Sequence, residues 1–281
     1  MPELPEVETV RSVLQEILPG LRITSVVSMR PKMLRGQDPD NFARGLEGRT
    51  VEGVERRGKF LLIRLDLRTL LIHLGMTGQI FACSEEGSAC LPSTRQDLPD
   101  KHTHLRMELT DGKKLYFRDV RMFGRYSLID AEGEKGLFRR MGPEPLERGF
   151  TARMFFERSR GRRTSIKALL LDQHFVAGVG NIYADESLFR AGIHPKICAG
   201  DLTLEQSRKL HRAIRKVLRE AIFSGGTTLS DYLDPRDRKG TFQWKLRVYG
   251  REGEPCSRCQ TPIQKTVIAQ RGTHLCPRCQ Q

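Results

Sequence analysis

Residues 256–279 read CSRCQTPIQKTVIAQRGTHLCPRC, and this stretch decides the fold at the C-terminal end of the chain. It contains two Cys-x-x-Cys pairs, Cys256/Cys259 and Cys276/Cys279, separated by sixteen residues. That spacing is typical of a zinc ion held by four thiolates. A disulfide framework is the alternative, and a cytosolic chain disfavours it. Because four thiolates leave no coordination position open, we expect one structural Zn²⁺ (Zn2+) here.

The charge of the chain is unevenly distributed. Its 281 residues carry a formal net charge of +14. Residues 1–150 contain 24 Lys and Arg against 22 Asp and Glu, whereas residues 151–281 contain 24 against 12. A C-terminal half at +12 exceeds what solubility needs. We therefore prefer a nucleic-acid partner over a merely solvated surface, and both over acidic membrane lipid.

The composition favours a globular cytoplasmic protein. Hydrophobic residues make up 38% of the chain, and no stretch approaches the ~20 apolar residues of a membrane span. The start MPELPEVETV has acids where a secretion signal has bases and an apolar core. We expect a monomer in the cytoplasm with no membrane partner. Cys83, Cys90 and Cys198 are interpreted as buried or free thiols.

Residue patterns predict an α+β chain. Residues 1–140 are β-rich with one opening helix, residues 141–149 are a linker, and residues 150–225 are helical. Residues 226–281 hold a polar loop and the zinc unit. In the helical part, Thr203 and Gln206 form a capping-box pattern before a long helix. The remaining expected elements are helices at Ile166–Leu171 and Ile182–Ala191, and strands at Arg22–Met29, Lys59–Leu65, Thr69–Leu74, Gly78–Cys83, His104–Thr110 and Lys114–Phe117.

The first residues can carry chemistry. Removal of the initiator methionine is expected before a small residue, and Pro2 then offers a secondary amine at the chain end. A terminal α-amine has a pKa of about 7.7–8, so more of it is neutral and nucleophilic than of a lysine. Its attack on a sugar aldehyde gives an iminium cation, which is an electron sink for eliminating phosphates. Many chains begin Met-Pro, so Pro2 alone is a weak signal.

Two acids follow the proline. Glu3 adjoins Pro2 and can protonate a leaving sugar oxygen as a general acid. Glu6 lies in the first turn of the expected helix, where its plainer role is a favourable interaction with the helix dipole. The residues alone favour that plainer role for Glu6.

Motifs along the whole chain resemble the bacterial formamidopyrimidine-DNA glycosylase family. In order, they are MPELPEVETV, His73-Leu-Gly-Met76-Thr-Gly, Gly178-Val-Gly-Asn181-Ile-Tyr-Ala, Gly192-Ile-His-Pro195, Gly225-Gly-Thr-Thr228, Val248-Tyr-Gly-Arg251 and the zinc unit. Each motif is weak alone, but together they keep the family order from residue 1 to residue 279. Leu4 favours this branch over the related endonuclease VIII branch, which usually has Gly at that position.

The resemblance implies a fold and an activity. The fold is an N-terminal β-sandwich with a flanking helix, a helix–two-turn–helix domain and a C-terminal zinc-finger hairpin. The activity is that of a bifunctional DNA glycosylase and abasic-site lyase, which removes 8-oxoguanine and formamidopyrimidines from damaged double-stranded DNA. Two alternatives stay open: an endonuclease VIII-like glycosylase for oxidised pyrimidines, and a non-catalytic zinc-containing DNA-binding protein. The intact Pro2-Glu3 start favours an enzyme.

The resemblance also implies catalytic roles. Pro2 is the implied Schiff-base nucleophile for β,δ-elimination, and Glu3 is the implied general acid. Glu6 becomes an active-site carboxylate. Lys59 matches the supporting lysine of the N-terminal domain, although a polar residue ahead of a buried strand is the plainer interpretation.

Further positions match DNA contacts. Asn181 and Arg271 match phosphate ligands, and Arg271 is counted among the catalytic residues. Asn181 opens a helix whose free N–H groups can face a phosphate, and Arg271-Gly272 is expected at the tip of the zinc-unit hairpin. His73 matches a position at the DNA surface, with a satisfied core histidine as the alternative. The basic run Arg158–Lys167 adds phosphate-attracting charge, with Lys167 as a DNA contact, or is simply solvated.

Three residues match those that fill the space left by an extruded base. Met76 and Phe123 can wedge into the base stack, and Arg121 can hydrogen-bond the orphaned partner base. Each has a core or surface role as its plainer interpretation. The family usually reads Asp-Pro-Arg-Arg-Phe-Gly, whereas this chain reads Asp119-Val-Arg-Met-Phe-Gly124, which puts the stiffness of the loop in doubt. The loop Thr227–Gly240 is expected to be a mobile lid over the base.

Overall fold

The computed structural model describes residues 2–28, 30–34, 36–83, 98–229 and 232–281. The chain forms two compact units. Unit 1 comprises Met1–Arg139 and Ser224–Thr241, and unit 2 comprises Arg140–Phe223 and Phe242–Gln281. The segment 224–241 therefore leaves the helical unit, packs within unit 1, and returns.

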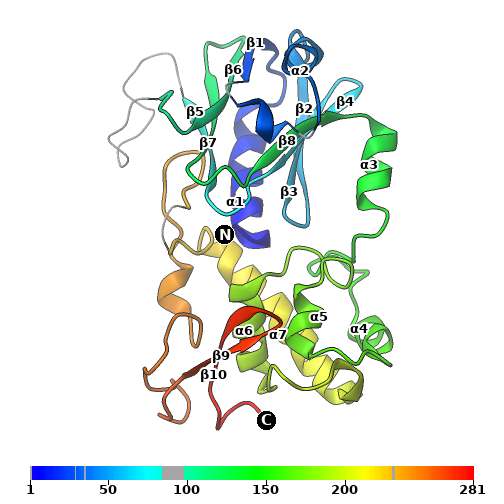
Figure 1. Ribbon diagram of the computed structural model, residues 1–281, viewed down its shortest axis with the longest axis vertical. Helices are drawn as coiled ribbons and strands as arrows, with labels where there is room; N and C mark the ends of the chain where they lie inside the picture. Colours follow the sequence, from blue (N-terminus) through cyan, green and yellow to red (C-terminus); the bar gives the residue numbers. More distant parts are fainter. Residues whose placement is uncertain (1, 29, 35, 84–97, 230–231) are drawn as a thin grey trace. The chain divides into compact units, whose positions relative to one another are not determined.

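Unit 1 contains two four-stranded antiparallel sheets, ordered β1-β6-β7-β5 and β2-β3-β4-β8 (Figure 1). Apolar side chains of both sheets, among them Met107 and Ile72, share one buried core. This arrangement confirms the expected sandwich. The strands are β1 Ile23–Ser28, β2 Val51–Arg57, β3 Phe60–Leu65, β4 Arg68–His73, β5 Gly78–Cys83, β6 Thr103–Leu109, β7 Lys114–Asp119 and β8 Arg125–Ile129.

Helix α1 (Leu4–Ile17) joins that core. Val7, Val10 and Leu14 recur at helical spacing and are buried, and the helix packs against β2 and β3 (Figure 1). A proline in the first turn costs no hydrogen bond because the N–H groups there have no partner within the helix. The packing of α1 therefore fixes the position of Pro2 and Glu3, which directly precede the helix.

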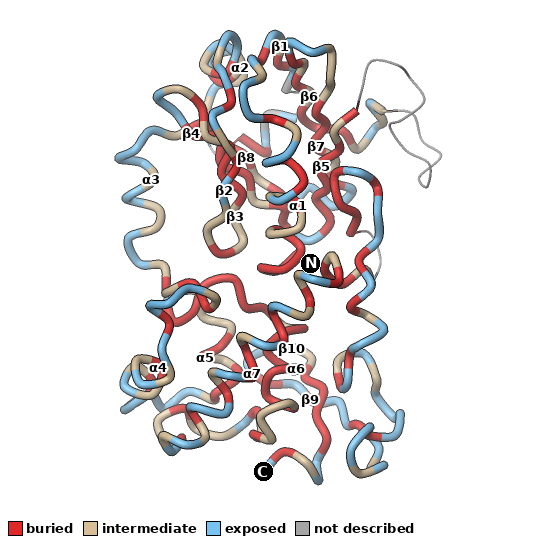
Figure 2. The backbone as a smooth tube through the Cα atoms, turned by 180° about the vertical axis from the view of Figure 1, so that it is seen from behind, coloured by how far each residue is buried: buried red, intermediate tan, exposed pale blue. Residues whose placement is uncertain are grey.

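Several elements of unit 1 were not expected from the sequence. They are strands β2 and β8, the short helix η1 (Pro31–Met33), and helices α2 (Pro39–Leu46) and α3 (Ala131–Phe138). Helix α3 contributes no buried residue (Figure 2), so it lacks the apolar stripe that reveals a helix in a sequence. Cys83 is disulfide-bonded, which corrects the free-thiol interpretation, whereas Cys198 is a free thiol and Cys90 lies outside the described residues.

Unit 2 is helical and ends in a hairpin. Helix α6 packs against both α7 and strand β10. The capping box of α7 is formed as expected: the N–H of Thr203 donates to Oε1 of Gln206 at 2.9 Å, and the N–H of Gln206 donates to Oγ1 of Thr203 at 3.1 Å. The elements are α4 Ala152–Ser159, α5 Ile166–Leu171, α6 Asn181–Ala191, η2 Ala199–Asp201, α7 Leu204–Phe223, η3 Phe242–Lys245, β9 Gln264–Ile268 and β10 Arg271–Leu275.

The expected linker, residues 141–149, packs onto unit 2. The guanidinium of Arg215 on α7 donates to the carbonyl oxygens of Pro145, Leu146 and Glu147 at 2.7–3.1 Å. Among the described residues, no helix combines the length and apolarity needed to cross a bilayer.

Candidate active site and DNA contacts

The residues that precede α1 are buried in unit 1. Pro2 is buried, and Glu3 and Glu6 are each only 1% exposed. The N–H of Glu3 donates to Oε2 of Glu6 at 2.8 Å. Because Glu6 lies one helical turn further on, this bond fixes the path of the backbone that carries Pro2.

The same carboxylate holds the loop 224–241. Oε1 of Glu6 accepts the N–H of Thr227 at 2.7 Å, and the Tyr232 hydroxyl donates to the backbone carbonyl of Glu6 at 3.2 Å. Gly226 has φ +85°, and a Cβ there would meet Oε1 of Glu6 at 3.0 Å. The carboxylate of Glu6 thus joins the backbone of Glu3 to that of Thr227. Glu6 is therefore a positioning residue as well as a helix-terminus acid.

Burial in this part of unit 1 also affects the phenol of Tyr232. Burial and then the nearby charge of Glu6 raise its pKa well above the usual value. Tyr232 therefore stays a neutral donor to Glu6. Its contact with Glu6 was not visible in the sequence because 226 positions separate the two residues.

The described part of the loop 224–241 is internally hydrogen-bonded. At its base, the N–H of Thr241 donates to the carbonyl of Ser224 at 2.8 Å. Further along, Oδ1 of Asp234 accepts the N–H groups of Arg236 and Arg238, both at 2.9 Å. The described residues form a turn around Asp234, and the mobile lid expected from the composition of Thr227–Gly240 stays a prediction.

Lys59 and His73 lie at the same end of the second sheet. Lys59 follows Gly58 in the two-residue turn between β2 and β3, and the next residue, Phe60, pairs with His73 on β4. The His73 ring meets the Phe60 ring edge-on at 4.9 Å, and its Nδ1 accepts the N–H of Gly75 at 3.1 Å. Both residues are half-buried. His73 is thus neither a core histidine nor a freely rotating one.

Two loops that follow β4 and β7 meet through Asp119. This fully buried carboxylate accepts the Thr77 hydroxyl, the N–H of Arg121 at 3.1 Å and the N–H of Gly124 at 2.7 Å. A Cβ on Gly75 would lie 2.5 Å from the Gly124 nitrogen, so only glycine permits this approach. The sequence did not reveal the role of Asp119, although its place at the start of the loop was a signal.

The three residues matched to void filling project from these loops. Met76 is 38% exposed, Phe123 is 49% exposed, and the Arg121 guanidinium lies 5.5 Å from the centroid of the Phe123 ring. Met122, where the family usually has Arg, adopts φ +53°. The hydrogen bonds of Asp119 to Arg121 and Gly124 hold this loop at both ends.

In unit 2, buried polar groups hold the hairpin onto the helices. Nδ2 of Asn181, the first residue of α6, donates to the carbonyl of Gly272 at 3.0 Å. Lys167 is fully buried, and its ammonium bonds Oδ1 of Asp185 at 2.6 Å, Oγ1 of Thr273 at 2.7 Å and the Gly272 carbonyl at 3.1 Å. This placement corrects the expectation that Lys167 ends a solvated basic run and contacts DNA directly.

Asp185 on α6 makes a further contact that holds the hairpin. Its Oδ2 accepts the N–H of His274 on β10 at 2.9 Å. Arg271 is exposed and begins β10 directly after a two-residue turn at Ala269 (φ +49°) and Gln270 (φ +59°). The turn residues, rather than Arg271-Gly272, therefore form the tip. Asp185 was missed from the sequence, although an acid within the buried run 182–189 was an available signal.

The four cysteines of the zinc unit converge. Their Sγ atoms all lie within 4.8 Å of one another, with 3.9 Å between Cys256 and Cys279 and 3.5 Å between Cys259 and Cys276. Four thiolates at about 2.3 Å around a tetrahedral Zn²⁺ stand about 3.8 Å apart. The cluster therefore fits one zinc ion, which is structural because all four positions are taken by cysteine.

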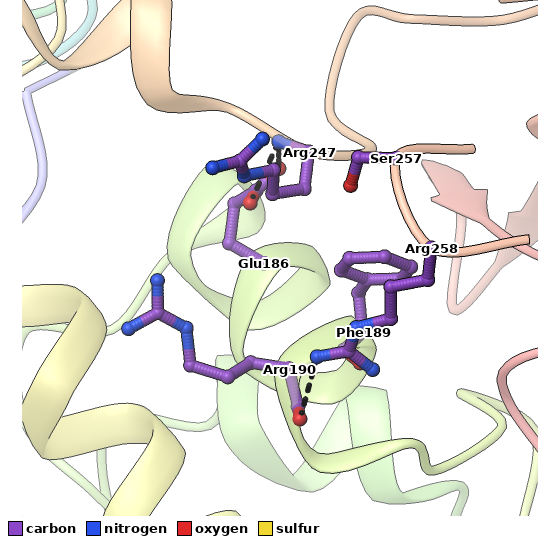
Figure 3. A pocket seen from close by; sticks show the side chains of 6 residues that line it. All are labelled: Glu186, Phe189, Arg190, Arg247, Ser257 and Arg258. Carbon is purple, nitrogen blue, oxygen red and sulfur yellow. Dashed lines mark hydrogen bonds between the residues drawn. The ribbon is translucent and has the colours of Figure 1, made fainter. Parts of the chain in front are cut away.

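The zinc unit is also tied to the C-terminal end of α6. Arg258, between the first two ligands, lies 4.4 Å over the Phe189 ring and donates to the carbonyls of Phe189 at 3.0 Å and Arg190 at 3.1 Å (Figure 3). Both carbonyls lie in the last turn of α6, where few backbone donors remain, and that of Phe189 also accepts the N–H of Gly192 at 3.1 Å. Nearby, burial raises the pKa of Glu186, whose carboxylate accepts three backbone N–H groups from residues 247–249.

Comparisons with known families cover most of the chain. Residues 1–126 match the formamidopyrimidine-DNA glycosylase N-terminal domain, and residues 141–232 match the formamidopyrimidine-DNA glycosylase H2TH domain. Residues 253–281 match the zinc finger found in FPG and IleRS.

Full-length relatives agree with these matches. The formamidopyrimidine-DNA glycosylase of Chloroflexus aurantiacus is 47% identical over 100% of this chain and 98% of its own. The MutM (FPG) protein of Thermus thermophilus is 44% identical with a TM-score of 0.86, covering 99% of this chain and 98% of that one. The Lactococcus lactis Fpg complex with abasic-site DNA has a TM-score of 0.89 at 38% identity, covering 99% of each chain. The chain therefore belongs to the formamidopyrimidine-DNA glycosylase family.

Proposed function

We propose that this chain excises oxidised purines from duplex DNA and then cuts the abasic site, with Pro2 as its nucleophile. Solved relatives are bound to DNA containing an abasic site, carbocyclic 8-oxo-G or N7-benzyl-Fapy-dG. The observation that carries the proposal is the buried start of the chain, where Glu6 fixes the backbone of Glu3 and, through it, of Pro2. We place the activity of the protein at the bacterial nucleoid, in the cytoplasm.

The first stage is base excision. Once Met1 is removed, the Pro2 nitrogen lone pair attacks C1′ of the damaged nucleotide. The base departs with the electrons of its C1′–N bond and takes up the proton that the Pro2 nitrogen releases. Glu3 donates its proton to the sugar ring oxygen as the ring opens, which leaves a C1′ iminium on Pro2. Because a secondary amine gives a cationic iminium without a further proton, the intermediate is already activated.

The second stage is strand cleavage. Loss of a C2′ proton lets the C2′ electron pair form a double bond and expel the 3′ phosphate, with the iminium taking up the charge. A second elimination expels the 5′ phosphate, and water then hydrolyses the iminium to restore Pro2. This sequence is the β,δ-elimination expected from the family resemblance.

We assign the remaining residues to holding the DNA. Asn181 and Arg271 contact phosphates, and Lys167 acts only through the hairpin because its ammonium is buried. Lys59 supports catalysis from the turn between β2 and β3, and His73 contacts the DNA from the same end of the sheet. Two exposed loop tips supply the side chains that replace the extruded base, namely Met76, Arg121 and Phe123.

Lesion preference tests the assignment to oxidised purines. We expect faster excision of 8-oxoguanine opposite cytosine than opposite adenine, because Arg121 donates hydrogen bonds only and cytosine offers O2 and N3 as acceptors. An unmatched bond costs about 1–3 kcal/mol, which corresponds to roughly tenfold or more in rate. Faster removal of thymine glycol would favour the endonuclease VIII-like alternative. A cytosine preference that survives Arg121→Ala would remove Arg121 from this role.

Glu3→Gln separates the two stages. Loss of the general acid should slow base excision by about 100-fold or more, while cutting at a preformed abasic site stays measurable because Pro2 can attack an open sugar directly. Equal loss of both activities would make Glu3 merely structural. Wild-type protein that binds lesion duplexes without excising any base would favour the non-catalytic alternative.

A further inference from the structure

The solvent side of α7 carries a row of cations. The exposed residues between positions 208 and 219 are all basic: Arg208, Lys209, Arg212, Lys216 and Arg219. Lys209, Arg212, Lys216 and Arg219 follow one another at intervals of three or four residues, and Arg208 lies one turn before Arg212. These spacings place the row on one face of the helix, over about 16 Å. The opposite face, which includes Leu210, Ile214 and Val217, is buried. The row is therefore a continuous stripe, which we call the α7 stripe.

Two adjoining pockets make the surface along the stripe concave. One of about 250 Å³ is lined by Arg190, Ala191, Lys209, Arg212, Ala213 and Lys216. The next, of about 350 Å³, is lined by His211, Arg212, Arg215, Lys216, Arg219 and Glu220. Arg212 and Lys216 line both. Arg190 also lines the pocket of Figure 3, where Arg247 and Arg258 extend the basic surface.

Little negative charge offsets the stripe. Glu205 pairs with Lys209 at 2.8 Å, and Glu220 pairs with Arg190 at 2.8 Å. In the part of the chain that the structure describes, Arg212, Lys216 and Arg219 make no ion pair.

The positive charge of the stripe contributes to the lowered pKa values of two neighbouring side chains. The pKa of Glu205 is lowered by its bond to Lys209, with Arg208 and Arg212 adding to the effect. The pKa of His211 is lowered by burial first and also by Arg215 and Arg212. Like charges four residues apart on a helix repel each other and destabilise it. A polyanionic ligand would relieve that repulsion.

Within unit 2, the stripe lies at the other end of α6 from Asn181, which we assign to the lesion duplex. It adjoins Arg190 and Ala191, at the C-terminal end of α6. Asn181 and its hydrogen bond to Gly272 on β10 lie at the N-terminal end of α6. That end is about 14 Å along the helix axis from Arg190. The phosphate contact that we assign to Asn181 therefore leaves the stripe cations without an assigned partner.

We propose that the α7 stripe binds the sugar-phosphate backbone of a second DNA duplex while the first is held for repair. The proposal rests on the proposed function for the first duplex. Duplex DNA fits better than an acidic protein because the row itself is purely cationic, whereas protein interfaces concentrate apolar and aromatic anchors at their centre. Phe223, an exposed aromatic residue of α7, lies one turn beyond the end of the row. DNA interfaces are polar and strongly positive. A protein that holds two duplexes can pass directly from one to the other.

The test uses the full chain and a matched control. The stripe variant carries Lys209→Gln, Arg212→Gln, Lys216→Gln and Arg219→Gln, which keep good helix formers. The control carries Arg68→Gln, Lys101→Gln, Lys135→Gln and Arg153→Gln, four exposed cations elsewhere. Both variants lose the same charge. A complex with a labelled lesion duplex of about one helical turn (~10 bp) is chased with unlabelled, undamaged duplex.

For wild type and control, the dissociation rate of the labelled duplex should rise in proportion to the competitor concentration. In a second measurement, energy transfer between two differently labelled duplexes should report a ternary complex of the protein with both. For the stripe variant, the rate should stay constant and the ternary signal should vanish. The salt slope for the second duplex should fall by about 3 to 4 as four phosphate contacts are lost. Single-turnover excision of the short duplex should be equal in all three proteins.

A competitor-independent rate in wild type would overturn the proposal, as would equal loss of transfer in both variants. Displacement of the second duplex by polyglutamate, with the stripe binding polyglutamate more tightly than duplex at the same salt, would assign the surface to an acidic protein instead. Bridging that depends on the stripe in a protein without excision activity would reject the proposed function and keep this inference.

Discussion

Each unit of the molecule uses one buried carboxylate to hold a functional segment, and the two carboxylates differ in their partners. Glu6 in unit 1 accepts two backbone N–H groups, from Glu3 and Thr227. Asp185 in unit 2 accepts one backbone N–H, from His274, and pairs with the buried ammonium of Lys167. One carboxylate positions the proposed nucleophile, and the other positions the strand that begins with Arg271.

The different partners determine how each unit responds to loss of its buried carboxylate. Backbone donors left unsatisfied cost about 1–3 kcal/mol, whereas an ammonium left alone in a buried site costs more because removal of one partner strands a charge. Unit 2 should therefore be the more sensitive to loss of its carboxylate. Unit 1 should lose activity before it loses its fold.

Asp185→Ala should give the largest effect. The buried Lys167 ammonium would lose its partner, and the free energy of unfolding of unit 2 should fall by about 3–5 kcal/mol, measured by urea denaturation. The double variant Asp185→Leu with Lys167→Met should recover most of that stability without restoring DNA affinity, because the hairpin would still lack its polar anchor. Normal affinity in the double variant would show that the ion pair does not position Arg271.

Glu6→Gln should have an intermediate effect. The amide nitrogen of Gln would face one of the two N–H donors, so the free energy of unfolding should fall by about 1–3 kcal/mol. Base excision and abasic-site cutting should fall together, because the backbone that carries Pro2 loses its fixed path. Glu8→Gln, a partly exposed acid of the same helix, is the control. An equal effect at both positions would reduce Glu6 to a helix-dipole contribution.

Gln270→Gly should have the smallest effect and the opposite sign. Ala269 and Gln270 both adopt positive φ in the hairpin turn, and glycine removes a backbone cost of about 1 kcal/mol. The melting temperature should rise slightly while DNA affinity stays unchanged, because the anchors on Gly272, Thr273 and His274 set the strand. A change in affinity would give the turn a part in placing Arg271.

The sequence predicted what depends on local spacing. The four zinc ligands, the α7 capping box and the opening helix are all repeats or pairs within a short stretch, and the structure contains each of them. It did not predict the burial of Lys167, because the partner Asp185 lies on another helix. The contacts of Glu6 with Thr227 and Tyr232 span more than 220 residues, so no local pattern encodes them.

The most direct test of the account is covalent trapping. Purified protein is mixed with an 8-oxoguanine duplex in the presence of borohydride, which reduces an iminium to a stable amine, and the adduct is located by peptide mass analysis. We expect the adduct on Pro2, at a chain end that lacks Met1. An adduct on Lys59, or on any other lysine, would contradict it.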